Sequence, residues 1–576
     1  MSTAHTTINI LEPQHHYQHS RITILLTWLQ LTAVRLGFTL VAVVCAMIYT
    51  TYRNIIYYTR LVLQCGRQYK WHDIHVVDSS VVLGNESNAY SVCIIGGGLS
   101  GICMALQCKI NNIETFVLFE SNSNVGGTWS SNQWQNSECD IQSILYSYSF
   151  ITDYIWSAQY STYHEICDYI QHCIDKYDVQ SNIQCRTTVT HCHWCNELNL
   201  YQVHTMNQHN ITNIIYCKYV VNAIGVLRQP SIPHIIDSDR YLGQSFHSAR
   251  YDHTLDLTNK RVAIIGSGAS AISIITGIQH YVNKLYLFQR TAQYVVPRLQ
   301  YNFSTLRQFI YYYIPWIQKL VRTIQYYFND SIVLGSRYQS LNINQSLQLL
   351  SIDYMYTQTY NNILLQQKLI PNYTIGCKRI LLSDTYYNTI QQPNVQLVTD
   401  NVKQFTSNSI ITNNNNQYDI DVVIYCTGFN VHYNNIKITG VDTINTNELY
   451  CSMYRGCTQL YRPNMFHIMG YNTVVSHNST VTQIESACHY IINALKYCNQ
   501  HNIKSLQVKS DVVQQYNRYI QTELSHTVFS GDSDCISWFM SSTNNQRINT
   551  ASWPLFSYNY YLMMQNFDHI SYDYII

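Results

Sequence analysis

Short apolar runs that lead into glycine-rich turns recur along the chain and mark two similar units. Residues 91–95 form such a run, and residues 102–110 follow the turn with helical spacing. Residues 262–265 begin the second unit, while residues 116–119 and 285–288 supply the next apolar run in each unit. Short buried strands that alternate with helices are typical of α/β folds built on a parallel sheet. The pattern therefore predicts two α/β units in one chain.

The turn of the first unit has the spacing G-x-G-x-x-G. Gly96 and Gly98 permit a tight turn and the close approach of a pyrophosphate, and Gly101 lets the helix pack against the strand. The free N–H groups at the start of that helix favour an anion. Glu120 ends the next strand, about 20 residues further on, where an acid accepts hydrogen bonds from a ribose. These signals predict a Rossmann-like dinucleotide site; the alternative is a glycine-rich turn in an ordinary α/β domain.

The second unit repeats the turn but ends its next strand differently. Gly266 and Gly268 are retained, and Ala271 replaces the third glycine, which the motif permits. The following strand ends in Arg290 and Thr291 instead of a carboxylate, and an arginine there suits the 2′-phosphate of NADP. An acid in one site and an arginine in the other indicate that FAD and NADPH bind together, with electrons passing from nicotinamide to flavin.

The composition of the chain limits the kinds of partner that it is expected to bind. The chain has 576 residues, 12% of them charged, and a net charge of +1, so it is long enough for two to four domains and lacks the basic runs of a nucleic-acid binder. The 19 cysteines show no repeating framework, which favours reduced thiols in the cytosol. Residues 191–195 contain metal-ligand residue types, but no second ligand pair stands nearby. We interpret them as a surface hairpin and predict no metal site.

The N-terminus contains a long apolar stretch that Arg35 interrupts. Residues 22–34 and 36–49 are each too short to span a bilayer, which takes about 20 residues, but together they are long enough. More basic residues follow the stretch than precede it, which places the remainder of the chain on the cytosolic side. The sequence predicts a membrane anchor at residues 22–50 with membrane lipid as a partner and the endoplasmic reticulum as a candidate membrane. The alternative is a helix packed on the enzyme in a cytoplasmic protein.

The stretch Tyr241-x-Gly243-x-x-x-His247-x-x-x-Tyr251 lies between the two glycine motifs. It resembles the fingerprint of the flavin-containing monooxygenases, in particular the F-x-G-x-x-x-H-x-x-x-W pattern of their Baeyer–Villiger type. Tyr251 stands where that type has Trp, and a terminal Tyr or Phe is more usual in the N- and S-oxidising relatives. The resemblance implies that these residues belong to a hinge between the units, which His247 orients.

Residues 126–150 resemble the stretch that wraps the flavin in this family. Residues 134–136 replace the family's Tyr-Pro-Gly, which leaves the shape of that loop open. Val189 stands where family members contact adenine through the backbone. The resemblance implies FAD contacts from Gly127, Thr128, Trp129, Asp140 and Tyr146.

A third segment, residues 376–379, resembles the family's catalytic stretch. The resemblance implies that Lys378 binds the 2′-phosphate of NADP, that Arg379 is the catalytic arginine, and that Asp140 orients it. The alternatives are a structural salt bridge or a phosphate ligand for Arg379 and a purely flavin-positioning role for Asp140. The family's hinge segments, its flavin-side segments and its C-terminal segments are matched by residues 223–225 and 426–428, 470–473 and 476–479, and 535–538 and 553–554.

The resemblance implies an activity. An FAD- and NADPH-dependent monooxygenase would insert one oxygen atom of O₂ into a small-molecule ketone through a C4a-peroxyflavin and give an ester or lactone. The alternatives are an N- or S-oxygenating enzyme acting on an amine or sulfide, a disulfide reductase with the same two folds, and a non-catalytic or NADPH-oxidase-like flavoprotein tethered to a membrane.

The order of the motifs predicts the domains. Residues 1–85 form an N-terminal extension, residues 86–249 the first part of an FAD domain, and residues 250–425 an NADP domain with a helical insertion at 303–370. Residues 426–576 complete the FAD domain. We also expect residues 421–425 to add a strand to the FAD sheet. The predicted fold class is α/β, with two Rossmann-like domains, a helical insertion and an N-terminal hydrophobic segment.

Overall fold

The structure is a computed structural model that describes residues 84–113, 115–337, 343–431, 436–442, 451–530, 537–543 and 546–576. Residues 22–50, where the membrane segment was predicted, lie outside these ranges, as do residues 535 and 536. In the described part of the chain no helix combines the length and the apolar character needed to cross a bilayer. We therefore correct the predicted membrane anchoring and withdraw the lipid partner. The prediction required residues 22–34 and 36–49 to form one spanning helix with Arg35 inside it, and a charged side chain within the hydrocarbon core is costly.

The first sheet is built around β1 (Tyr90–Ile95), the strand before the first glycine turn. β1 runs parallel to β2 (Phe116–Phe119) on one side and to β6 (Thr212–Asn222) on the other. β6 changes neighbour along its length: residues 212–217 pair with an antiparallel strand, β5, and residues 220–222 pair with β22, which arrives from the C-terminal part. The other strands of this sheet are β3 (Ile183–Gln184), β4 (Thr187–Cys195), β5 (Leu200–Asn207), β19 (Lys437–Thr439), β20 (Met453–Tyr454), β21 (Thr458–Gln459) and β22 (Met465–His467).

Side chains of β1 alternate between two cores, because successive residues of a strand point to opposite faces. Val92 and Ile94 join a large cluster with helices α2 (Leu99–Ile110), α4 (Tyr163–Tyr177) and α12 (Thr480–Gln500). Cys93 and Ile95 face the smaller cluster beneath the β4–β5 hairpin. The sheet is therefore buried on both sides at the strand that leads into the glycine turn, which fixes the position of that turn.

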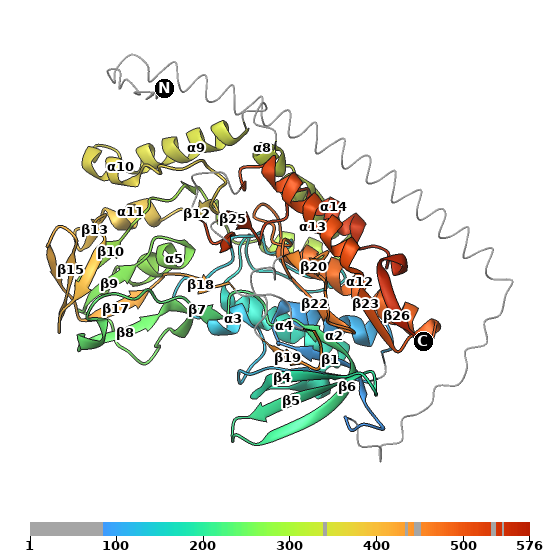
Figure 1. Ribbon diagram of the computed structural model, residues 1–576. Helices are drawn as coiled ribbons and strands as arrows, with labels where there is room; N and C mark the ends of the chain where they lie inside the picture. The colour runs from blue at the N-terminus through green and yellow to red at the C-terminus, as the bar shows by residue number, and fades with distance from the viewer. Residues whose placement is uncertain are drawn as a thin grey trace, which may run out of the picture.

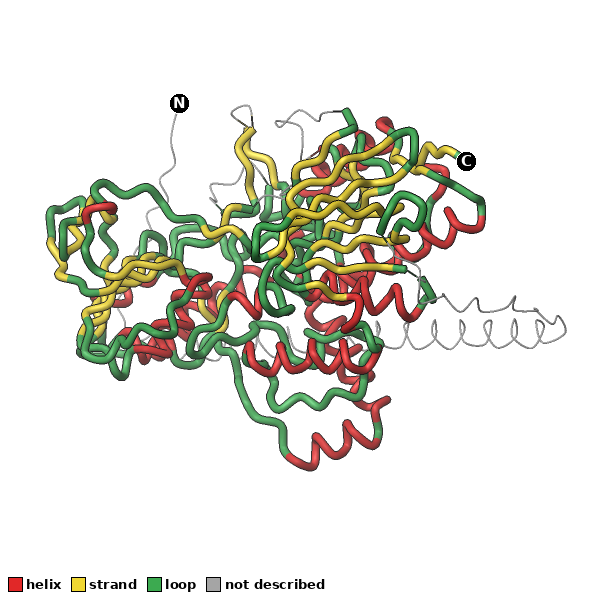
Figure 2. The backbone as a smooth tube through the Cα atoms, turned by 90° about the horizontal axis from the view of Figure 1, so that it is seen from below, coloured by secondary structure: helices red, strands yellow, loops and turns green. Residues whose placement is uncertain are grey.

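The second sheet is entirely parallel, in the order β13 (Val395–Val398), β10 (Lys284–Phe288), β9 (Arg261–Ile265), β17 (Val422–Tyr425), β8 (Gln244–His247). The strands gather into two separate groups when seen from below (Figure 2), and the second sheet lies to the left of the first in Figure 1. The expectation that residues 421–425 extend the first sheet is wrong, because β17 lies between β9 and β8. A run of four buried apolar residues predicts a strand but does not indicate its sheet. β8 joins this sheet although it precedes residue 250.

The stretch predicted to be helical, residues 303–370, contains five helices among the residues that the structure describes there, 303–337 and 343–370. They are α6 (Thr305–Tyr313), α7 (Pro315–Asp330), α8 (Val333–Arg337), α9 (Ile343–Gln358) and α10 (Ile363–Leu369), and α9 and α10 lie above the second sheet in Figure 1. The remaining elements cover the two units. These are α3 (Thr128–Ser131), α5 (Ala269–Ile278), α11 (Tyr386–Ile390), α13 (Ser510–Ser525), α14 (Ser557–Met563), β7 (Gln229–Pro230), β11 (Val295–Val296), β12 (Leu381–Leu382), β14 (Val402–Phe405), β15 (Ser409–Thr412), β16 (Gln417–Asp419), β18 (Phe429–Asn430), β23 (Ser505–Val508), β24 (Met540–Thr543), β25 (Gln546–Asn549) and β26 (Tyr572–Ile575).

The segment with metal-ligand residue types lies in the β4–β5 hairpin. Its Cys192 and Trp194 point into the core, while His191 and His193 both lie against the hydroxyl of Thr439, at 3.1 and 3.0 Å. Within the described ranges no group of three or more His, Cys, Asp or Glu side chains could hold a metal ion. Most described cysteines are free thiols; Cys377, which forms a disulfide, departs from the expectation of reduced thiols.

Candidate active site

The first glycine turn is packed tightly on one side and open on the other. Gly96 has φ +107°, and a Cβ on it would lie 2.7 Å from the carbonyl oxygen of Ala223, at the end of β6. A Cβ on Gly101 would lie 1.8 Å from the carbonyl oxygen of Gly96. A Cβ on Gly98 would meet only Gly127, at 3.5 Å, and no side chain caps α2. The free helix amides and the bare glycine surface fit a pyrophosphate.

Glu120 closes this turn from the end of β2. Its Oε2 accepts a hydrogen bond from the N–H of Gly97 at 2.7 Å, its Oε1 accepts one from Asn122 at 2.8 Å, and the residue is 5% exposed. The N–H of Thr187 donates to the Glu120 carbonyl at 2.9 Å, which brings the start of β4, and Val189 two residues further on, beside the acid. The structure thus joins three segments that the sequence predicted at one nucleotide site.

The segment predicted to wrap the flavin lies against the same turn. Gly127, at φ +55°, packs on Gly98, and Thr128 begins the short helix α3. The indole N–H of Trp129 donates to the hydroxyl of Tyr146 at 3.1 Å, and the two rings pack edge to face. Burial raises the pKa of the Tyr146 hydroxyl, so this phenol remains neutral and able to donate.

The second turn has the same backbone shape. Gly266 has φ +119°, and a Cβ on it would lie 2.3 Å from the carbonyl oxygen of Cys426, just after β17. A Cβ on Gly268 would meet no atom within 4 Å. The hydroxyl of Ser267 donates to the Thr291 carbonyl at 2.8 Å, which fastens the turn to the end of β10. This turn also leaves an open glycine surface at a helix start.

Cationic side chains gather at the end of β10. Arg290 is exposed, and the Lys378 ammonium lies 4.6 Å from the centre of the Tyr373 ring. Burial and the nearby charge of Arg290 lower the pKa of Lys378, as expected for two cations held close together. A cavity of about 380 Å³ opens beside them and is lined by Arg290, Thr291, Lys368, Asn372 and Thr399 among others.

Arg379 and Asp140 meet between the two units. Arg379 Nη2 donates to Asp140 Oδ1 at 2.6 Å, and the two side chains are 35% and 32% exposed. The Asp140 carboxylate raises the pKa of the Arg379 guanidinium above its ordinary value, and both charges also act on the Tyr146 hydroxyl. Burial and Asp140 raise the pKa of the neighbouring Cys139 thiol to about 12. The structure therefore places the Arg379 guanidinium beside the segment predicted to wrap the flavin, with its charge paired to the Asp140 carboxylate.

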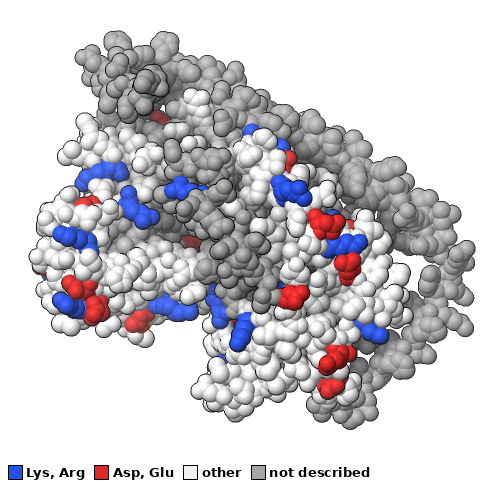
Figure 3. All heavy atoms as spheres, viewed as in Figure 1, with Lys and Arg blue, Asp and Glu red and all other residues white. Residues whose placement is uncertain are grey.

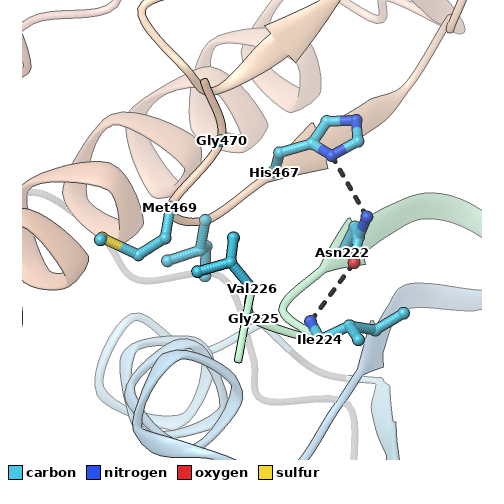
Figure 4. Close-up of a pocket in the computed structure, with 8 residues that line it drawn as sticks. Asn222, Ile224, Gly225, Val226, His467, Met469 and Gly470 are labelled. Atoms are coloured by element: carbon cyan, nitrogen blue, oxygen red, sulfur yellow. Dashed lines mark hydrogen bonds between the residues drawn. The ribbon is translucent and has the colours of Figure 1, made fainter. Parts of the chain in front are cut away.

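Each of the two segments predicted to act as hinges, residues 223–225 and 426–428, lies beside a buried histidine. At the first hinge, beside Gly225, Asn222 donates to Nδ1 of His467 at 3.3 Å and accepts from the N–H of Ile224 at 3.3 Å (Figure 4). Burial lowers the pKa of His467 to about 3, so this ring is neutral. At the second hinge His247 ends β8 beside the backbone of Gly428, and burial lowers its pKa as well.

The fingerprint residues Gly243 and Tyr251 lie on either side of β8, Gly243 before its first residue and Tyr251 after its last. A Cβ on Gly243 would lie 2.7 Å from the carbonyl oxygen of Asp421, which explains a glycine there. Tyr251 packs edge to face on Phe246 in the core of the second unit. Both residues therefore pack against the second unit.

Sequence reasoning missed several side chains that hold the site together. Trp134 crosses from the first unit into the core of the second and donates to Ser273 at 2.9 Å. Arg322 of α7 donates to the carbonyl oxygens of Ile144 and Leu145, at 2.6 and 3.1 Å, and so holds the segment that carries Tyr146. These contacts join residues far apart in the chain, and a local motif carries no signal for them.

Charged side chains are sparse over the outside of the molecule. On the face drawn in Figure 3 they are scattered singly or in small groups, and most of the visible surface is uncharged. The cationic group near the end of β10 therefore stands out by its position beside a glycine turn, not by its size.

Comparison with known proteins identifies the family. The model of the flavin-binding monooxygenase-like family matches residues 89–307 and 314–540. A Baeyer–Villiger monooxygenase of Pseudomonas aeruginosa is 33% identical over 488 residues, covering 84% of this chain and 90% of that protein. One from Streptomyces coelicolor is 30% identical over 469 residues, with 80% and 88% covered. The chain belongs to the flavin-binding monooxygenase-like family, and the predicted family and the predicted class of enzyme, a flavoprotein monooxygenase, are confirmed.

Solved structures share the fold. A structure of OTEMO complexed with FAD and NADP has a TM-score of 0.74 and 21% identity, and covers 84% of this chain and 99% of its own. Cyclohexanone monooxygenase from Rhodococcus sp. Phi1, bound to NADP⁺, also has a TM-score of 0.74, with 22% identity and 84% and 99% covered. The predicted α/β fold is confirmed.

Proposed function

We propose that the chain is a Baeyer–Villiger monooxygenase that binds FAD at the first glycine turn and NADPH at the second. The observation that carries this proposal is the Arg379–Asp140 pair, 2.6 Å apart, placed between the two units. Relatives at 30% identity and above carry the name Baeyer–Villiger monooxygenase. The substrates are O₂ and a small-molecule ketone, and the product is an ester or lactone.

The two cofactors would be held by different chemistry. Gly96, Gly98 and Gly101 receive the FAD pyrophosphate with Glu120 near its ribose, and the flavin contacts are Gly127, Thr128, Trp129, Tyr146 and Asp140, with Val189 at the adenine. For NADPH, Gly266 and Gly268 receive the pyrophosphate, while Arg290, Thr291 and Lys378 surround the 2′-phosphate. When bound, NADPH supplies hydride and reduced FAD activates O₂.

Arg379 would stabilise negative charge where oxygen adds to the substrate carbonyl. A guanidinium keeps its proton at any working pH, and Asp140 raises its pKa further. Because the donor is already in position, little reorganisation is needed as the charge develops. Asp140 would aim the guanidinium, while Gly243, His247 and Tyr251 set the angle between the units. We also propose the domain division 1–85, 86–249, 250–425 and 426–576.

The test is Arg379→Ala with a ketone and a thioether as paired substrates. We expect bound FAD and NADPH oxidation to persist, while ester formation falls by about 10²–10³, the usual cost of removing such a donor. Arg379→Lys is the matched control that keeps the charge and should retain more activity than Arg379→Ala. Full ester formation by Arg379→Ala would refute its role, and a wild-type enzyme that gives sulfoxide alone would move the chain to the N- or S-oxygenating class.

A further inference from the structure

A three-residue segment of the second unit, Arg298-Leu299-Gln300, reaches into the first unit beside Asp140. The guanidinium of Arg298 pairs with the Glu138 carboxylate and donates to the Cys139 carbonyl at 2.8 Å. It also lies 4.8 Å from the centre of the Tyr160 ring, and the Arg298 side chain is only 14% exposed. Arg298 therefore grips the two residues immediately before Asp140.

Gln300 makes a second set of hydrogen bonds to the first unit. Its side-chain oxygen accepts from the N–H of Tyr160 at 3.1 Å, and its side-chain nitrogen donates to the Tyr160 carbonyl at 2.8 Å. This two-point contact to a backbone fixes direction as well as distance. Arg298 and Gln300 thus hold the first unit from either side of Leu299.

The segment is itself held by Asp384. The Asp384 carboxylate accepts from the N–H groups of Arg298, Leu299 and Gln300, at 2.8, 3.1 and 3.0 Å. Leu299 has φ +56° although it is neither glycine nor asparagine, and it is 73% exposed. A leucine in this conformation persists only where its surroundings impose it, and three hydrogen bonds to one carboxylate are such surroundings.

The contacts form a closed path around the proposed catalytic pair. Arg379 binds Asp140 from one side. Arg298 binds the preceding residues, Glu138 and Cys139, from the other side. Asp384, which binds the Arg298 segment, lies five positions after Arg379 in the same stretch of chain. Any movement of residues 138–140 relative to residues 379–384 must therefore break one of these contacts.

We propose that Arg298 is a positioning residue that sets the geometry of the Arg379–Asp140 pair, with Asp384 as its support. The inference rests on the proposed function, since it assigns Arg298 to the alignment of the same arginine. In this role Arg298 acts through Asp140, the residue that follows Glu138 and Cys139. A displacement of about 1 Å at a reacting centre costs on the order of 10²-fold in rate, so loss of the grip should be visible in oxygenation.

The experiment compares Arg298→Met with wild type in the full chain. We expect the product formed per NADPH oxidised to fall about 10-fold or more, with bound FAD and the rate of NADPH oxidation within about twofold of wild type. Asp384→Asn, which keeps an acceptor but loses the charge, should give an intermediate loss. In an Arg379→Lys background, Arg298→Met should produce little further loss, because coupled residues are not additive.

Arg261→Met is the matched control. Arg261 also holds a carboxylate, Asp421, at 2.8 and 3.2 Å, but it lies at the start of β9, five residues before the second glycine turn. We expect this variant to lower the melting temperature while it leaves the product-to-NADPH ratio unchanged. Equal loss of the ratio in both variants, or no loss in Arg298→Met, would overturn the proposal.

A readout that needs no activity separates this inference from the proposed function. Hydrogen–deuterium exchange should become faster in residues 138–146 and 376–384 in Arg298→Met and stay as in wild type in Arg261→Met. If wild type oxygenates neither a ketone nor a thioether, the proposed function fails, and the exchange pattern still decides the role of Arg298. Unchanged exchange in both segments would refute that role.

Discussion

The two nucleotide units share a glycine turn but close it with opposite chemistry. In the first, Glu120 is 5% exposed and its carboxylate already binds the Gly97 N–H, so the acid is built into the turn. In the second, Arg290 is exposed beside a cavity of about 380 Å³ and close to Lys378. A buried site whose acid is already hydrogen-bonded within the protein suits a tightly bound cofactor. An open cationic site suits a cofactor that binds and dissociates in each catalytic cycle. The difference teaches that one backbone motif serves both purposes through a few side chains at the strand end.

We expect the largest effect from a substitution at Gly101, the third glycine of the first turn. Gly101→Ala places a Cβ 1.8 Å from the Gly96 carbonyl oxygen, and backbone atoms must move. We expect a loss of about 3 kcal/mol in unfolding free energy, at the upper end for overpacking, together with loss of bound FAD. Thermal unfolding and the flavin absorbance of the purified protein measure both. Normal FAD content in this variant would contradict the tight packing of the first turn.

Removal of the cations of the second site should change coenzyme preference. Arg290→Gln and Lys378→Gln each remove a charged partner for the 2′-phosphate, and such hydrogen bonds contribute about 1.5–3 kcal/mol. We expect the KM for NADPH to rise about 10-fold to 100-fold in each variant, and the KM for NADH to remain unchanged. A parallel rise for NADH would show that these side chains do not recognise the phosphate.

The first hinge should make folding sensitive to acid. Burial lowers the pKa of His467 from 6.5 to about 3. The unfolded chain therefore takes up a proton as pH falls below 6.5, and the folded chain does not. The contribution of the neutral His467 ring to the unfolding free energy is complete above that pH. It is lost on acidification, at about 1.4 kcal/mol per pH unit, until the folded pKa is reached.

His467→Gln should reduce the slope of the unfolding free energy against pH by up to about 1.4 kcal/mol per pH unit, the equivalent of one proton. Urea unfolding at several pH values measures this slope. His209→Gln is the control, since His209 is exposed on a turn. His247 at the second hinge should act in the same direction, because burial lowers its pKa too. An unchanged slope in His467→Gln would mean that the ring takes up its proton at the same pH in the folded and the unfolded chain.

The smallest effect is expected at the matching position of the second turn. Ala271 is 1% exposed and already occupies the place of the third glycine, in the first turn of α5. Ala271→Gly should cost about 0.5–1 kcal/mol, the usual price of glycine in a helix, and leave the KM for NADPH within about twofold. A loss as large as that of Gly101→Ala would show that the Ala271 methyl group fills a tightly packed site and not an ordinary helix position.

Local patterns predicted the parts of the site that local sequence determines. Gly96, Glu120, Gly266 and Arg290 were found because a strand, a turn and a strand end follow one another in the chain. The position of β17 was predicted wrongly, since four buried apolar residues suit either sheet. The apolar N-terminal stretch suggested an anchor although Arg35 divides it.

The contacts between the units could not be predicted in this way. Arg298 and Asp140 are distant in sequence, and no local pattern around Asp384 indicates its contact with residues 298–300. Leu299 gave none at all, because a leucine rarely adopts a positive φ. Such residues are identified by their three-dimensional neighbours, and the folded chain is needed to see them.

The change of partner along β6 has a consequence for the order of synthesis. Residues 220–222 of β6 pair with β22, and β22 is synthesised only after every strand of the second sheet. At bacterial or eukaryotic translation speeds that interval is on the order of 10–50 s. During this time the second unit has all of its strands and can fold. The first unit still lacks β22 and the C-terminal residues that complete it. The half encoded first is therefore the last to be finished. A nascent chain stalled near residue 465, where β17 has left the ribosome and β22 has not, should resist proteolysis in its second unit before its first.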